Sequence, residues 1–76
     1  MRQIQFTPHA LRKLRERKIL VRTIEEVFEK PDESFKSHNR NVVYRKFGSK
    51  YLLVVYEADE KLIKVITIFW RDDPNW

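Results

Sequence analysis

The chain has 76 residues and a formal net charge of +5, with two histidines and no cysteine. A chain of this length makes one domain with a small core. The absence of cysteine excludes disulfides and thiolate chemistry, and two histidines weigh against a zinc site. No apolar stretch approaches the roughly 20 residues that span a bilayer and no signal peptide opens the chain, so we expect a soluble, cytoplasmic protein without a cofactor or metal ion.

Positive charge is concentrated in the first two thirds of the chain. Residues 1–30 hold eight Lys or Arg against four Glu, residues 31–50 hold five against two acidic residues, and residues 51–76 hold three against five. This basic excess favours contact with a polyanion such as RNA or with an acidic protein segment. The alternative is a solvated, lysine-rich surface of the kind that thermophilic proteins carry.

The first predicted elements are a short strand and a basic helix. Polar and apolar residues alternate over residues 3–6, and Thr7 is a suitable N-cap for a helix that begins at Pro8 and runs to about residue 18. Spacings of three and four place His9, Arg12, Lys13 and Glu16 on one helix face. Either His9 transfers a proton beside an anion-binding surface, or it lies at the helix terminus without a chemical role.

A second amphipathic helix is predicted after a linker over residues 19–22. Its apolar residues recur at helical spacing and are Ile24, Val27 and Phe28. Thr23 and Glu26 form a candidate capping box at its start. Pro31 marks its end, because the residue before a proline disfavours helical geometry.

After Pro31 the apolar period changes to two, which predicts a sheet. The expected strands cover residues 34–38, 42–47, 51–57 and 62–70, with turns at 48–50 and 58–61. Short turns require antiparallel pairing, and the almost wholly apolar segment 51–57 predicts a central strand. The predicted fold is a two-layer α+β domain over residues 1–71, with a short strand, two helices, a three- to four-stranded antiparallel sheet, and residues 72–76 as a tail.

These motifs resemble a family of small proteins in the RelE/ParE-like toxin superfamily, which is grouped with barnase, EndoU and colicin nucleases. The resemblance spans residues 4–71 and is carried by Phe6-Thr7-Pro8-His9-Ala10, the second helix up to Pro31, and Val65-Ile66-Thr67-Ile68. It implies a RelE-like fold and a metal-independent ribonuclease that acts as the toxin of a toxin-antitoxin pair. It also implies RNA, including RNA at the ribosome, as the substrate and an acidic antitoxin protein as the partner. Some members of the superfamily bind gyrase instead, so the alternative is a non-catalytic module that binds nucleic acid or a protein. Leu20 departs from the family, which commonly has a small polar cap there.

By position, the resemblance implies His9 and Thr67 as the polar residues that mark the family and Arg45 or Lys46 as its phosphate-binding residue. Cleavage without a metal needs a group that takes the proton of the RNA 2′-hydroxyl, and histidine is the residue type that most often transfers protons near neutral pH, so His9 is the candidate. We therefore expect His9, Arg45 and Thr67 as catalytic residues. The residues expected to bind nucleic acid are Arg12, Lys13, Arg40 and Lys46.

Strand alternation refines this expectation. It predicts one face for Ile63, Val65, Thr67 and Phe69, and it allows only one of Arg45 and Lys46 on the face that bears Thr67. His38, beside Arg40, is either a second proton carrier or a solvated loop residue. The aromatic residues that either stack on bases or pack within the fold are Tyr44, Tyr56 and Trp70.

Overall fold

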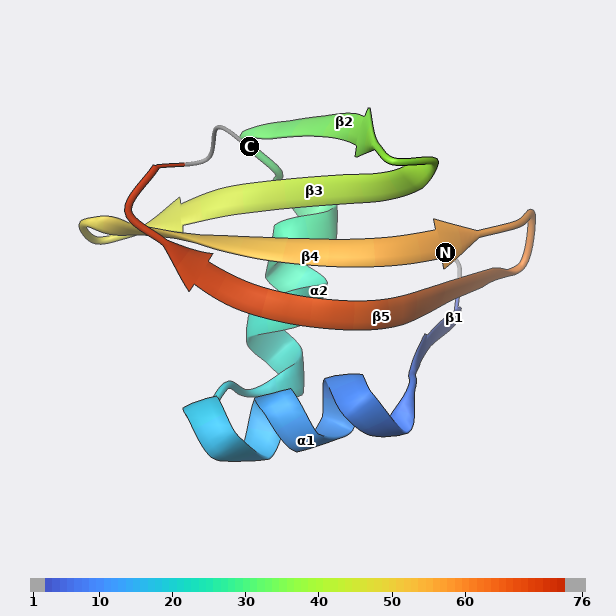
Figure 1. The fold of residues 1–76 in the computed structure, drawn as a ribbon, viewed down its shortest axis with the longest axis horizontal. Helices are drawn as coiled ribbons and strands as arrows, with labels where there is room; N and C mark the ends of the chain where they lie inside the picture. The colour runs from blue at the N-terminus through green and yellow to red at the C-terminus, as the bar shows by residue number, and fades with distance from the viewer. Residues whose placement is uncertain (1–2, 74–76) are drawn as a thin grey trace.

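A computed structural model describes residues 3–73 (Figure 1). The elements in chain order are β1 (Gln3–Phe6), α1 (Pro8–Arg17), α2 (Val21–Glu29), β2 (Glu33–Ser37), β3 (Arg40–Phe47), β4 (Lys50–Ala58) and β5 (Leu62–Arg71). The strand order is β1-β5-β4-β3-β2, with β4 in the centre as predicted. Strands β2 to β5 pair antiparallel, whereas β1 joins beside β5 in parallel and makes the sheet five-stranded and mixed. The predicted two-layer α+β fold is confirmed, but the sheet has more than the predicted three or four antiparallel strands because β1 pairs with β5 in parallel. The predicted tail lies partly outside the described residues.

Helix α1 begins as the sequence predicts. Thr7 has an extended backbone and its side chain accepts a hydrogen bond from the backbone N–H of Ala10 at 3.1 Å, while Pro8 occupies the first turn. The Thr7 hydroxyl also donates to the carbonyl oxygen of Ile66 at 3.0 Å. The cap therefore fixes the start of α1 to β5. At its other end the helix stops at Lys18, which adopts a left-handed backbone with φ 54°.

Helix α2 begins earlier than predicted. It starts at Val21 with Leu20 as N-cap, and Leu20 makes no side-chain capping bond. The predicted capping box is wrong because Thr23 lies inside the helix, where its backbone N–H already bonds to the carbonyl oxygen of Leu20 at 3.0 Å. The linker between the two helices therefore covers residues 18–20 rather than the predicted 19–22. The predicted end before Pro31 is confirmed.

Apolar side chains form one cluster on each face of the sheet. Both helices lie on one face, with α1 alongside β5 and α2 crossing behind β3 and β4 (Figure 1). The buried residues between helices and sheet are Ala10, Leu14, Ile24, Val27, Val43, Leu52, Val54, Ile63, Val65 and Ile68. On the opposite face, here called the open face, the buried residues are Val42, Tyr44, Leu53 and Val55, flanked by Phe35, Tyr51, Ile66 and Phe69. Among residues 3–73, neither helix is long and apolar enough to cross a membrane.

A register shift in β5 changes the predicted alternation. Val55 pairs with Thr67 but the next residue of β4, Tyr56, pairs with Val65, so Ile66 is an extra residue in β5. Directly paired residues share a face, and Val55 belongs to the open-face cluster. Thr67 therefore lies on the open face. The predicted common face for Ile63, Val65, Thr67 and Phe69 is therefore wrong, because the extra residue reverses the alternation and puts Thr67 and Phe69 on the open face.

Candidate functional site

His9 and Thr67 meet at the surface. The Nε2 atom of His9 lies 3.1 Å from Oγ1 of Thr67, although the two residues are 58 positions apart in the chain. Two local features produce this contact. The Thr7 cap holds the first turn of α1 against β5, since the Thr7 backbone N–H also bonds to the carbonyl oxygen of Val65 at 3.0 Å. The extra residue Ile66 then turns Thr67 onto the open face.

The contact fixes one ring nitrogen of His9 and leaves the other available. If Nε2 carries the proton, it donates to Oγ1 of Thr67 and Nδ1 holds a free lone pair; in the other tautomer the Thr67 hydroxyl donates to Nε2 and Nδ1 is protonated. No other described residue hydrogen-bonds to the His9 side chain. Because the His9 ring is exposed, Nδ1 is accessible to a ligand.

The structure does not bring Arg45 to His9 and Thr67. Arg45 pairs with Leu52 of the helix-side core, its Nη1 donates to the carbonyl oxygen of Lys30 at 2.7 Å, and its Nη2 lies 3.8 Å from Oε1 of Glu26. Arg45 thus connects the end of α2 to β3. The sequence-based expectation that it contacts phosphate beside His9 and Thr67 disagrees with this placement.

Lys46, the alternative to Arg45, shares the open face with Thr67 but lies far along it. Its Nζ is 5.9 Å from the ring centre of Tyr51. Val42 is the β3 residue in line with Thr67, through Val55 of β4. Lys46 lies four residues further along β3, which corresponds to about 13 Å at the usual rise of a strand. It therefore does not contact the His9–Thr67 pair.

Arg12 and Lys13 follow His9 on α1. Arg12 is exposed and Lys13 is half-buried. Neither forms an ion pair with another residue of the described part of the chain. Since they lie three and four positions after His9, both cations share its helix face, as predicted.

Arg40 and His38 lie at the other side of the open face. His38 has a left-handed backbone with φ 52° in the turn between β2 and β3, and Arg40 Nη1 lies 3.9 Å from Oε1 of Glu57. A shallow hollow of about 230 Å³ is lined by Ser37, His38, Arg40, Val42 and Val55. Because Val55 pairs directly with Thr67, this hollow borders the strand that carries Thr67.

On the other side of the line from Val42 through Val55 to Thr67, towards Lys46, the open face carries a group of aromatic rings. Tyr44 contacts Phe35 edge-on at 6.3 Å between ring centres and Tyr51 at 5.6 Å. The Tyr44 hydroxyl donates to Oε2 of Glu33 at 2.7 Å. This hydrogen bond to a carboxylate, together with burial, raises the pKa of Tyr44 from 10.0 to about 12.

Only one of the three predicted stacking residues lies on the open face. Tyr44 does, whereas Tyr56 packs edge-on against Phe28 at 5.0 Å and Trp70 against Phe47 at 6.2 Å on the helix side. The sequence reasoning missed Phe35, Tyr51 and Phe69. The position of Tyr44 in the alternating pattern of β3 could have indicated a face with aromatic residues. The face of Phe69 could not have been predicted in this way, because it depends on the extra residue in β5.

Among residues 3–73, no group of three or more His, Cys, Asp or Glu side chains lies close enough together to hold a metal ion. A sequence model of one protein family, described as "Domain of unknown function (DUF4258)", matches residues 6–70. No curated protein and no solved structure matches the chain.

Proposed function

The chain belongs to the DUF4258 family, whose match includes both His9 and Thr67, and we propose that it is a RelE-like, metal-independent endoribonuclease and the toxin of a toxin-antitoxin pair. The observation that carries this proposal is the surface contact between the His9 imidazole and the Thr67 hydroxyl. An exposed imidazole with one nitrogen held and the other accessible is a suitable general base.

His9 is the group that takes the proton from the RNA 2′-hydroxyl. The 2′-oxygen then attacks phosphorus and the bond from phosphorus to the 5′-oxygen breaks, which leaves a 2′,3′-cyclic phosphate and a 5′-hydroxyl. The leaving oxygen takes its proton from the imidazolium or from water. Thr67 orients the ring through its hydrogen bond. Proton transfer of this kind contributes about 10²- to 10⁴-fold in rate.

The surroundings of His9 suit a polyanion with unpaired bases. Arg12 and Lys13 lie on the same helix face, and the N-terminus of α1, where His9 is located, favours negative charge. Phe69, two residues after Thr67 on the open face, has a half-exposed ring on which a base stacks, and Tyr51, further along the same face and level with Arg71, offers a second ring. Single-stranded RNA is therefore the substrate class, and the antitoxin is an acidic protein that meets the same cations.

One observation favours the alternative of a non-catalytic module that binds nucleic acid or a protein. Arg45, expected to stabilise the charge on phosphorus, is bonded to Lys30 and Glu26 on the helix side. The same basic surface would then bind RNA without cleaving it, with an affinity that falls steeply with salt.

A cleavage assay separates the two functions. Single-stranded RNA incubated with the protein in EDTA yields cyclic-phosphate ends if the proposal is right, and a 2′-deoxy substitution at the cut site blocks the reaction. His9→Ala loses most activity, whereas His38→Ala is the matched control and retains it. Equal cleavage by His9→Ala and wild type would exclude His9 as the base. Salt-dependent RNA binding without product supports the binding module.

The toxin assignment has a separate test in cells. Expression of the wild-type chain arrests growth, and co-expression of an acidic partner protein relieves the arrest. The His9→Ala variant, expressed to the same level, does not arrest growth. Normal growth with wild-type protein present in soluble form would contradict the toxin assignment without affecting the cleavage result.

A further inference from the structure

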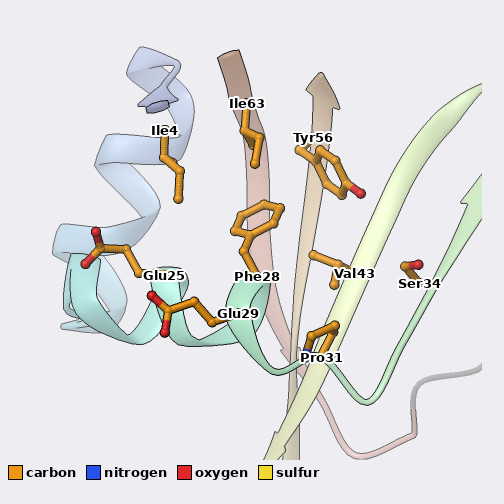
Figure 2. A pocket seen from close by; sticks show the side chains of 9 residues that line it. All are labelled: Ile4, Glu25, Phe28, Glu29, Pro31, Ser34, Val43, Tyr56 and Ile63. Carbon is orange, nitrogen blue, oxygen red and sulfur yellow. The ribbon is translucent and has the colours of Figure 1, made fainter. Parts of the chain in front are cut away.

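A groove of about 550 Å³ lies on the helix-covered side of the sheet, beside α2 (Figure 2). It is on the opposite face from Thr67. Helix α2 forms one wall, and Phe28 projects from it toward the strands (Figure 2). The floor takes one residue from each of the five strands, namely Ile4, Ile63, Tyr56, Val43 and Ser34. The groove is therefore mostly apolar and wide enough for a side chain of another molecule.

Two carboxylates stand on the rim of this groove. Glu25 and Glu29 lie one turn apart on α2 and both are exposed (Figure 2). Neither forms an ion pair with another described residue, in contrast to Glu26, which lies near Arg45. Among the residues that line the groove, these two carboxylates are the charged ones and none is a cation; Arg22 and Lys30 border Glu25 and Glu29 in a separate hollow. The complement of the groove is an apolar surface that carries cations.

The same chain has such a surface where α1 meets α2. The exposed large hydrophobic residues of the described part of the chain are Leu11, Leu20 and Val21, at 38%, 62% and 47% exposure. All three border one shallow apolar hollow, together with the cations Arg15 and Lys18. This set of five residues is called the α1–α2 corner. Clustered exposed apolar residues of this kind mark interaction sites.

We propose that the groove of one copy receives the α1–α2 corner of a second copy. Leu20, the most exposed of the apolar residues, enters the apolar floor, and Arg15 and Lys18 approach Glu25 and Glu29 of the other copy. Corner-to-corner contact would bring like charges together, as would groove-to-groove contact. The two surfaces differ, so the contact is head-to-tail. A domain of this size has a small core and gains stability from such association.

Sedimentation velocity from micromolar to near-millimolar concentration tests this interface. Wild type associates as concentration rises. Glu25→Lys/Glu29→Lys removes the groove charges and Leu20→Ser removes the apolar side chain of the corner, and each weakens association about tenfold or more. Ser is a good N-cap, so Leu20→Ser does not weaken α2. Glu60→Lys/Asp72→Lys is the control for net charge: both residues are exposed, neither lines the groove, and association is retained.

A mixture of the two variants gives the sharpest result. The groove variant keeps an intact corner and the corner variant keeps an intact groove, so an equimolar mixture forms a 1:1 complex at a concentration at which each variant alone is monomeric. If circular dichroism shows that Glu25→Lys/Glu29→Lys misfolds, Glu25→Gln/Glu29→Gln takes its place. A wild-type chain that stays monomeric throughout, variants that associate like wild type, or a mixture that stays monomeric would each overturn the proposal. Binding of a basic apolar peptide by a monomeric wild type would assign the groove to a different partner.

Discussion

The hydroxyl of Thr7 donates to the carbonyl oxygen of Ile66 at 3.0 Å while it accepts from the backbone N–H of Ala10 at 3.1 Å. One side chain therefore caps α1 and ties it to β5 at the residue before Thr67. The position of His9 depends on this double role, because His9 lies two residues after Thr7.

Thr7→Val removes both hydrogen bonds and nearly preserves volume. We expect a loss of about 1–2 kcal/mol in the free energy of unfolding. Urea denaturation followed by circular dichroism measures it. Thr7→Ser keeps the hydroxyl and is the control, with a much smaller loss. Equal stability of Thr7→Val and wild type would show that the bonds contribute nothing net.

At the start of α2, a substitution is expected to raise the stability of the fold. Leu20 occupies the N-cap of α2 with suitable extended geometry, at φ −80° and ψ 146°, but has no group that can cap. We expect Leu20→Asp to raise the free energy of unfolding by about 0.5–2 kcal/mol, because its carboxylate accepts from a free N–H and lies at the positive helix end. Denaturation at low micromolar concentration, where self-association is negligible, measures the gain. Leu20→Ala is the control without a cap, and a gain of the same size there would contradict the capping explanation.

The hydrogen bond between Tyr44 and Glu33 predicts that the stability of the folded state falls at alkaline pH. The pKa of Tyr44 is raised to about 12 by its hydrogen bond to Glu33 and by burial, above the ordinary value of 10.0. A raised pKa in the folded state means that the stabilisation is complete below pH 10 and is lost as pH rises from 10 to 12. Phenolate absorbance, compared between wild type and Tyr44→Phe, isolates this titration. In Glu33→Gln the midpoint of Tyr44 falls toward 10, and an unchanged midpoint would remove Glu33 as the main cause.

Sequence patterns predicted the elements well because each rested on local physics. Thr7 and Pro8 mark the start of α1, and the apolar run of β4 marks the centre of the sheet. The start of α2 was misplaced because Thr23 offered a plausible cap, whereas the packing of Ile24 and Val27 against the sheet holds the helix without one.

The site was predicted only in part, because its remaining features are not local. The resemblance implied that His9 and Thr67 both belong to the site, and in the structure the two side chains meet. The predicted face of Thr67 was wrong, since nothing in the apolar run of β5 marks Ile66 as an extra residue. The choice between Arg45 and Lys46 depended on strand register, which the turns alone do not fix.

Arg45 now has a structural role that can be tested against the expected catalytic one. Its bonds to Lys30 and Glu26 join α2 to β3. We expect Arg45→Ala to lower the free energy of unfolding by about 1–3 kcal/mol, because the charged hydrogen bond to a carbonyl is lost. The cleavage rate per folded molecule, measured below the unfolding temperature, stays within about threefold of wild type because the rate is set at His9. A loss of a hundredfold or more with unchanged stability would restore Arg45 to the catalytic site.

Thr67 is a positioning residue in the proposed reaction, since it acts through His9. Loss of one hydrogen bond of about 1–1.5 kcal/mol corresponds to about tenfold in kcat/KM for Thr67→Val. Thr67→Ser retains the hydroxyl and most of the activity. In a His9→Ala background Thr67→Val has no further effect, because the ring that it orients is absent. Cleavage kinetics on the two single variants and the double variant measure this coupling. If the two losses multiply instead, Thr67 contacts the substrate independently of His9, and the hydrogen bond between them is not the means by which it acts.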